Sequence, residues 1–305
     1  MKYKQIITYL FLTIFTLFGS ACSHNRFVND MIFLTPPIAN KKNFNSLTTM
    51  KYIEKQIAFG PRIPGSSGSI ATQEFILNEM EQSGWMVESQ DFEYNGIHST
   101  NIIAKSSPNP PRLILGTHYD SRACSDNESS FTLQLTPVPG ANDGASGTAV
   151  LLELGNILDI SKRDIWLVYF DSEDQGRLNG WEWSLGAQYF VDNLDFVPDD
   201  VIIIDMIGDK NLEIYKEINS DPTLTNSIWE EAAHLGFESV FIPEEKYSIY
   251  DDHIPFINRE ISATLIIDIE YPFWHTTEDT FLKVSQESID IVGNVLLSWI
   301  NKQNY

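Results

Sequence analysis

Apolar residues along the chain follow two alternating patterns, which predict helices and strands in turn. Some segments repeat apolar positions every three or four residues, as amphipathic helices do, whereas others are short and apolar throughout, as buried strands are. The expected helices are Ser46–Phe59, Ser67–Ser83, Ser146–Asp159, Leu185–Asn193, Asn226–Leu235 and Gln286–Lys302. The expected strands are Asn101–Lys105, Arg112–Gly116, Ile165–Phe170, Val201–Ile204, Leu212–Lys216 and Ala263–Ile269.

Several of the expected strands are apolar at consecutive positions, which indicates that both faces of their sheet are covered. Strands and helices also alternate along the chain. Together these features predict an α/β sandwich with a largely parallel central sheet. In sheets of this kind the active site lies beyond the carboxyl ends of the strands.

The first residues carry a different pattern, which is typical of an export signal. Lys2 and Lys4 precede an apolar run over residues 6–18, and the small residues Gly19–Ala21 lead directly to Cys22. The apolar run is too short for a comfortable membrane span. We therefore expect residues 1–21 to be a signal peptide, of the lipoprotein type, with Cys22 as the lipidated N-terminus. An ordinary cleaved secretion signal is the alternative, because the position three before the cysteine is a glycine, where a lipobox usually has leucine.

This N-terminal pattern also sets the expected location of the protein, an exported periplasmic or cell-envelope lipoprotein of a bacterium. Residues 22–43 read as a polar tether, and residues 44–305 as a single catalytic domain. Contact with the membrane is expected only through the N-terminal lipid. If Cys22 is lipidated, Cys124 is alone and forms no internal disulfide.

Composition narrows the classes of partner. The chain has 305 residues, of which 43% are hydrophobic, and this is enough to build a large core without disulfides. Acidic residues outnumber basic ones 42 to 20, so the formal net charge is −22. This charge excludes a general nucleic-acid binder, which needs a cationic surface.

Polar side chains that suit a metal follow four of the expected strands, and one more lies in the Gly-rich loop 140–147, which opens a helix. Imidazole and carboxylate groups without thiolates are typical of catalytic zinc. Glu173 lies beside one of these residues and could act as a general base. Each residue alone could be a helix cap, a loop acid or a packed side chain, but all of them lie where strands end. The candidate ligands are His118, Asp143, Asp174, Asp205 and His275.

Seven ordered motifs carry a resemblance to a known family. They are FGPRIPGS at Phe59, HYDS at His118, GANDGASG at Gly140, FDSED at Phe170, IDMIG at Ile204, DDHIPF at Asp251 and WHTTEDT at Trp274. In this order they resemble the zinc aminopeptidase family, whose superfamily includes the animal-type glutaminyl cyclases. The resemblance implies a three-layer α/β/α sandwich with a mixed central sheet and zinc at the strand ends.

Two branches of this superfamily differ in the number of zinc ions. The aminopeptidases hold two, which would correspond here to His118, Asp205 and a bridging Asp143 for one ion, and to Asp143, Asp174 and His275 for the other. The cyclases use one zinc, held by the equivalents of Asp143, Asp174 and His275. We therefore expect one zinc ion for a cyclase and two for an aminopeptidase.

Three features of the sequence resemble the cyclases more than the aminopeptidases. These are Trp274 directly before His275, Asp251 at a position where the peptidases commonly have serine, and the Trp-containing segment 180–186. One feature departs from the animal enzymes, because Asp174 stands where they have glutamate. The resemblance thus favours a bacterial member of the animal-type cyclases.

A cyclase would convert the N-terminal glutamine of peptides or proteins to pyroglutamate and release ammonia. Glu173 would transfer the proton, and Asp205 and Asp251 would form an acidic network that supports it. An apolar cage would hold the glutamine side chain in a folded conformation. The residues expected to form this cage are Trp274, Ile249, Phe273 and Trp181, with Trp183 either in the cage or in the core. The alternatives are a dinuclear aminopeptidase and a non-catalytic binding protein with the same fold. In the loop 122–139, Asp126 and Glu128 are expected to be solvated.

Overall fold

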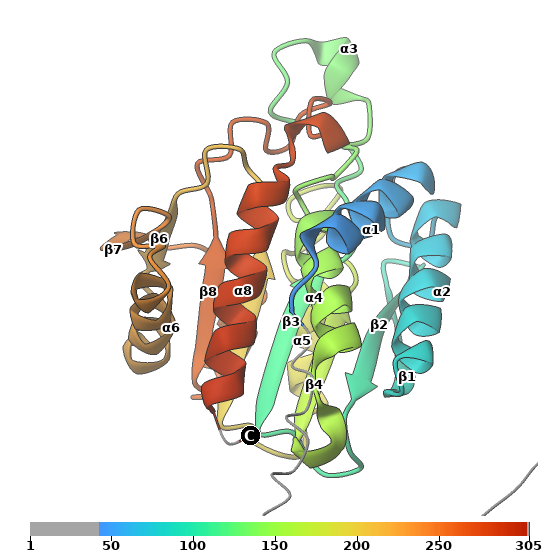
Figure 1. Ribbon diagram of the computed structural model, residues 1–305. Helices are drawn as coiled ribbons and strands as arrows, with labels where there is room; N and C mark the ends of the chain where they lie inside the picture. The colour runs from blue at the N-terminus through green and yellow to red at the C-terminus, as the bar shows by residue number, and fades with distance from the viewer. Residues whose placement is uncertain (1–42, 304) are drawn as a thin grey trace, which may run out of the picture. The chain divides into compact units, whose positions relative to one another are not determined.

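Six strands form the central sheet in the order β1-β2-β4-β3-β5-β8 (Figure 1). The computed structural model describes residues 43–303 and 305. Neighbouring strands are parallel from β4 through β3 and β5 to β8. At the other edge, β2 is antiparallel to β4, and β1 is antiparallel to β2. The sheet is therefore mixed and largely parallel, as predicted. The strands are β1 Met86–Tyr94, β2 Ile97–Lys105, β3 Leu113–His118, β4 Ile165–Phe170, β5 Asp200–Asp205 and β8 Ala263–Ile267.

Helices cover both faces of the sheet, which confirms the predicted three-layer sandwich (Figure 1). On β4, Leu167 joins the core under one layer of helices and Val168 joins the core under the other. Because successive side chains of a strand point to opposite faces, a strand covered on both sides must be apolar throughout. The main helices are α1 Ser46–Ala58, α2 Ser67–Gln82, α4 Ala145–Ile157, α5 Leu185–Asp192, α6 Pro222–His234 and α8 Gln286–Lys302.

Shorter elements lie in the connections. They are the helices α3 Phe131–Gln134 and α7 Ile254–Ile257, and the 3-10 turns η1 Ile160–Lys162 and η2 Phe281–Lys283. A second sheet consists of two parallel strands, β6 Ile214–Glu217 and β7 Phe241–Tyr247. The strand expected at 212–216 therefore corresponds to β6 and lies outside the central sheet.

Two strands and the starts of two further elements differ from the sequence expectation. β2 begins at Ile97, four residues before the expected start. β1 and β7 were not expected as strands, because most of their side chains are polar and exposed. α6 begins at Pro222, four residues before the expected start. The Asp221 carboxylate accepts hydrogen bonds from the N–H groups of Thr223 and Leu224, which caps this end of the helix.

None of the helices in the described part of the chain is long and apolar enough to cross a membrane. The expected signal peptide 1–21, Cys22 and nearly all of the expected tether lie outside the described residues.

Candidate metal centre and active site

The carboxyl ends of the parallel strands bring the candidate ligands to one edge of the sheet. His118 is the last residue of β3, Asp205 is the last residue of β5, and Asp174 lies four residues beyond the end of β4. Asp143 lies just before α4, and His275 follows β8. All five side chains are buried.

These five residues form two groups of three that share Asp143. In the first group, His118 Nε2 lies 3.1 Å from Asp143 Oδ1 and 3.0 Å from Asp205 Oδ1. In the second group, His275 Nε2 lies 2.9 Å from Asp174 Oδ1 and 3.8 Å from Asp143 Oδ2. Within each group one ligand atom per residue lies within 4.8 Å of the others. The arrangement thus offers two adjacent places for a cation.

Unpartnered oxygen atoms distinguish the two groups. Among the described residues, Asp143 Oδ2 and Asp174 Oδ2 are buried and have no hydrogen-bond partner. A buried carboxylate oxygen without a partner is costly unless a cation satisfies it. Both atoms belong to ligands of the group that contains His275, and Asp143 Oδ2 lies 3.8 Å from His275 Nε2. A set of one imidazole and two carboxylates is typical of catalytic zinc. The residues present therefore fit zinc at this group.

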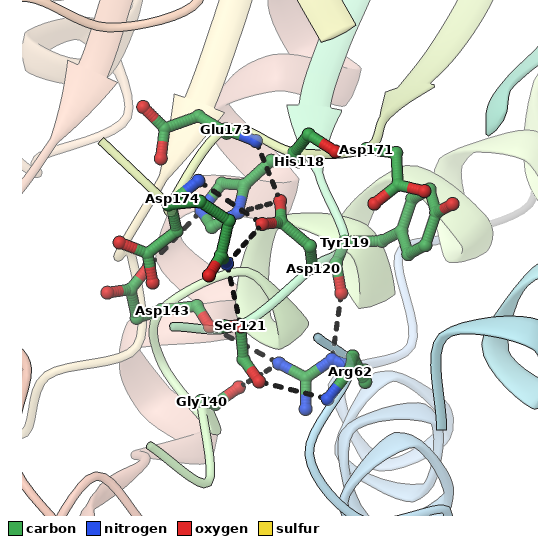
Figure 2. Close-up of polar contacts among 12 residues, drawn as sticks. Arg62, His118, Tyr119, Asp120, Ser121, Gly140, Asp143, Asp171, Glu173 and Asp174 are labelled. Atoms are coloured by element: carbon green, nitrogen blue, oxygen red, sulfur yellow. Dashed lines mark hydrogen bonds and ion pairs between the residues drawn. The ribbon is translucent and has the colours of Figure 1, made fainter. Parts of the chain in front are cut away.

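The turn that carries Asp143 is fixed from two sides. The buried Arg62 guanidinium donates to the carbonyl oxygens of Gly140 (2.6 Å) and Asp143 (3.3 Å) (Figure 2). The Asp279 carboxylate accepts from the N–H groups of Asn142 (2.9 Å) and Asp143 (3.1 Å). These contacts hold the backbone of the turn, so the Asp143 side chain has little freedom.

Asp120 connects the two groups from behind. Figure 2 shows its carboxylate beside His118, with the backbone N–H groups of Glu173 and Asp174 pointing to it. It lies 3.3 Å from His118 Nδ1 and accepts from Glu173 N (3.0 Å) and Asp174 N (3.2 Å). The HYDS motif contains this residue, but its role as an anchor depends on contacts 53 and 54 positions away.

Asp126 is exposed, as the sequence predicts, but its carboxylate is also paired with two side chains. Its Oδ1 lies 3.2 Å from His275 Nδ1, and Arg122 donates to both of its carboxylate oxygens at 2.7 and 2.6 Å. Burial opposes ionisation here, but the hydrogen bonds from His275 and Arg122 outweigh it and lower the pKa of Asp126. The carboxylate thus belongs to the surroundings of the site.

Three further carboxyl groups, those of Glu173, Asp251 and Asp252, form a buried cluster beside the two groups. Burial raises the pKa of Glu173 well above its usual value, and the nearby Asp251 adds to this effect while His118 opposes it. Burial and the neighbouring Asp205 raise the pKa of Asp251 to about 7. Carboxyl groups packed this closely cannot all be ionised, so the cluster can retain a proton at neutral pH.

A cavity of about 340 Å³ opens onto these groups. The indoles of Trp183 and Trp274 line it, together with Ile249. Phe273 and Trp181, which were also expected at the cavity, are not among its lining residues. The ring of Phe273 instead packs against that of Tyr271, with 5.6 Å between the ring centroids. The ring of Trp181 packs against that of Tyr94, with 5.3 Å between the centroids. The remaining lining residues are Asp143, Glu173, Asp174, Arg177, Asp205, Met206, Tyr247, Ser248, Tyr250, Asp251, Ile267, Ile269 and His275.

Comparison with known protein families identifies the family to which the chain belongs. Residues 101–300 match the model of Peptidase family M28. The chain belongs to Peptidase family M28. This agrees with the expected zinc aminopeptidase superfamily, whose fold the structure has.

Relatives and structural neighbours of this M28 protein include glutaminyl cyclases. The glutaminyl-peptide cyclotransferase of Boiga irregularis is 27% identical over 289 residues, which cover 77% of this chain and 75% of the relative. The structure of the Bacteroides thetaiotaomicron glutaminyl cyclase bound to N-acetylhistamine is 30% identical, with a TM-score of 0.81, and the match covers 87% of this chain and all of that one. The expected resemblance to the cyclases is therefore confirmed.

A zinc-dependent exopeptidase from Parabacteroides distasonis is similar to the same extent. Its structure is 28% identical, with a TM-score of 0.81, and the match covers 86% of this chain and all of that one. The M28 family and this neighbour indicate zinc as the metal, in agreement with the donor set of the site.

Proposed function

We propose that this protein is a zinc-dependent glutaminyl-peptide cyclotransferase, which converts the N-terminal glutamine of peptides or proteins to pyroglutamate with release of ammonia. One observation carries the proposal, namely the clustering of unpartnered oxygens in one group. The group of His275 contains two unpartnered oxygens, Asp143 Oδ2 and Asp174 Oδ2. In the other group, His118 Nε2 lies within 3.1 Å of both Asp143 Oδ1 and Asp205 Oδ1. This favours one zinc ion, held by Asp143, Asp174 and His275.

The reaction requires the α-amine of the substrate to attack the δ-carbon of its own side chain. A bond forms between the α-nitrogen and the δ-carbon, and the bond between that carbon and the amide nitrogen breaks. One proton must leave the amine and one must reach the departing nitrogen, which becomes ammonia. Zinc, when bound, supplies a Lewis acid that polarises the side-chain carbonyl.

Glu173 is placed to move this proton. Its side chain lines the cavity and is buried, and Ser184 Oγ donates to its Oε1 at 3.2 Å, which fixes that oxygen. Burial raises its pKa well above the usual value, so the carboxylate is a stronger base than an exposed one. Asp205 and Asp251 line the same cavity and give the proton a second place in the acidic network.

The cavity suits a glutamine side chain folded back on itself. Its volume of about 340 Å³ and its indole and isoleucine walls would restrict a short flexible side chain and exclude water. Trp183 and Trp274 stand beside His275, with ring centroids 6.0 and 4.0 Å from the imidazole. An apolar wall so close to the metal ligands favours ring closure over attack by water.

A second function, that of a dinuclear aminopeptidase, is supported by one observation. All five residues that two metal ions would need lie together, and a zinc-dependent exopeptidase is among the structural neighbours. In that case His118 would exchange its hydrogen bonds to Asp143 and Asp205 for a metal bond. Glu173 would then deprotonate a water molecule that attacks the peptide bond.

One assay separates the two functions. The purified protein is given peptides with N-terminal glutamine and chromogenic leucine peptides, and its zinc content is measured in parallel. Ammonia release from the glutamine peptides with one zinc per chain would support the cyclase. Release of free amino acids with two zinc ions per chain would instead establish the aminopeptidase, and absence of both activities would favour a binding protein.

We also propose that the protein is exported and anchored through a lipid on Cys22. The proposal rests on the basic residues, the short apolar run and the small residues that precede this cysteine. Labelling of the protein with radioactive palmitate in a bacterial host should be abolished by Cys22→Ala. Equal labelling of the two proteins would overturn the proposal.

A further inference from the structure

Both nitrogen atoms of the His275 imidazole have carboxylate neighbours, and the neighbour of Nδ1 is Asp126, in the loop 122–139. Nε2 lies 2.9 Å from Asp174 Oδ1 and 3.8 Å from the unpartnered Asp143 Oδ2, whereas Nδ1 lies 3.2 Å from Asp126 Oδ1. A carboxylate at Nδ1 keeps the proton on that nitrogen, so the lone pair of Nε2 is directed toward the metal site. Asp126 thus stands where an outer carboxylate would orient the ligand.

Asp126 is itself held by a buried cation. Arg122, whose side chain is 2% exposed, binds both carboxylate oxygens of Asp126 and also donates to the carbonyl oxygen of Asp174 at 2.8 Å. A guanidinium that binds a carboxylate with two hydrogen bonds fixes both its position and its plane. Arg122 therefore connects the backbone of one ligand to the side chain that faces another.

The Arg122 guanidinium also packs on the indole of Trp183, which in turn packs on the His275 imidazole. It lies 4.9 Å from the ring centre of Trp183, which is stacked on His275 at 6.0 Å with an angle of 15° between the planes. Cation, indole and imidazole thus form a stack that restricts rotation of the His275 ring. The ring is restrained at its edge by Asp126 and at its face by Trp183.

The backbone of His275 needs restraint as well. The φ angle of His275 is +55°, in the left-handed region that residues other than glycine seldom adopt. The backbone N–H of Asn127 donates to His275 O, and the side chain of Asn127 donates to Trp274 O. Residues 122–128 therefore hold both the main chain and the side chain of this ligand.

We propose that Asp126, held by Arg122, is a positioning residue that orients His275 for zinc. The proposal depends on zinc at the group of Asp143, Asp174 and His275 and is independent of the reaction that follows. It assigns to a partly exposed loop acid a role that its position in the sequence does not reveal. Loss of the Asp126 charge should weaken zinc binding while the fold is retained, because its side chain is 39% exposed.

The test is the zinc dissociation constant of the full-length protein, measured by competition with a chelator of known affinity. Asp126→Asn keeps the size of the side chain and removes its charge, and it should weaken zinc binding by about 10-fold, with Asp126→Ala at up to about 100-fold. Circular dichroism of the metal-free proteins should show the same fold for all variants.

Glu128→Gln is the matched control. Glu128 lies on the same loop and accepts from the backbone N–H and the hydroxyl of Thr277, so it anchors the same two segments without contacting His275. The zinc affinity of the Glu128→Gln variant should stay within about twofold of that of the wild type. Unchanged affinity in both Asp126 variants, or equal weakening in Glu128→Gln, would overturn the proposal. A wild-type protein that binds no zinc would overturn the proposed metal site instead.

Discussion

Glu173 combines burial, acidic neighbours and access to the cavity in one side chain. Glu173→Gln keeps its shape and its contact with Ser184 but cannot accept a proton, so we expect kcat to fall by about 10²- to 10⁴-fold. Zinc content should not change, since Glu173 lies outside the two groups that contain a histidine. Ammonia release and metal content of the same sample check both parts, and activity within tenfold of the wild type would rule out Glu173 as the base.

The two histidines should differ in their effect on zinc. His275→Ala removes a ligand of the group with unpartnered oxygens, so we expect the purified protein to lose its zinc. His118→Ala removes hydrogen bonds to Asp143 and Asp205 and should leave one zinc per chain. Metal analysis of the two variants checks this, and loss of zinc in His118→Ala as well would contradict a site with one ion.

Sequence alone could place the ligands but not all of their neighbours. His118, Asp174 and Asp205 could be found because they follow apolar strands, which are easy to recognise. Asp126 could not, because a lone acid in a loop has no pattern, and its contact with His275 joins residues 149 positions apart. The aromatic residues were only partly predictable, since the direction of each ring depends on local backbone angles.

At the scale of elements, β6 carries a carboxylate that organises the loop beyond β7. Glu217 lies at the end of β6, is buried, and accepts from the N–H of Ile249 at 2.9 Å. Its Oε2 lies 3.1 Å from His253 Nε2. Since Ile249 lines the cavity and His253 follows Asp251 and Asp252 in the chain, Glu217 supports one wall of the site from outside it.

This carboxylate should make stability depend on pH. Burial opposes its ionisation, but the hydrogen bonds with His253 and with backbone N–H groups outweigh it and lower the pKa of Glu217 to about 2. In the unfolded chain the pKa of a glutamate is about 4.3, so the charge of Glu217 stabilises the fold above that pH. This stabilisation is lost as the pH falls toward 2. Relative to Glu217→Gln, we expect an advantage on the order of 3 kcal/mol at pH 7.

Chemical denaturation of the two proteins at pH 7, 5 and 3 measures this difference. The advantage of the wild type should be the same at pH 7 and 5 and smaller at pH 3. A difference that is independent of pH would show that Glu217 acts only through its shape.

The elements themselves were predictable to different degrees. β4 and β5 were identified almost to the residue, because both of their faces are buried and only apolar side chains fit. β1 was missed since it forms the edge of the sheet and most of its side chains are exposed. An edge strand is specified by backbone pairing with its neighbour, and such pairing has little signature in the sequence.

At the scale of the whole molecule, zinc should contribute to the stability of the fold. The proposed ligands Asp143, Asp174 and His275 come from the residues just before α4 and from the segments after β4 and β8, so bound zinc would link three parts of the chain that are far apart in the sequence. At a zinc concentration 1,000 times the dissociation constant, binding adds about 4 kcal/mol, which for a domain of this size raises Tm on the order of 10 °C.

Thermal unfolding with a chelator and with increasing zinc checks this expectation. Tm should rise with zinc concentration in the wild type, and His275→Ala should show no such rise. A Tm that is independent of zinc in the wild type would contradict binding at this site.

The turn of Asp143 also has a consequence for the order in which the protein is made. Arg62 reaches this turn from near the start of the described domain, and Asp279 reaches it from near the end. During synthesis, the turn therefore cannot close until almost the entire chain has left the ribosome. Folding intermediates that lack the C-terminal segment would lack both Asp279 and the ligand His275, so they would have no complete metal site.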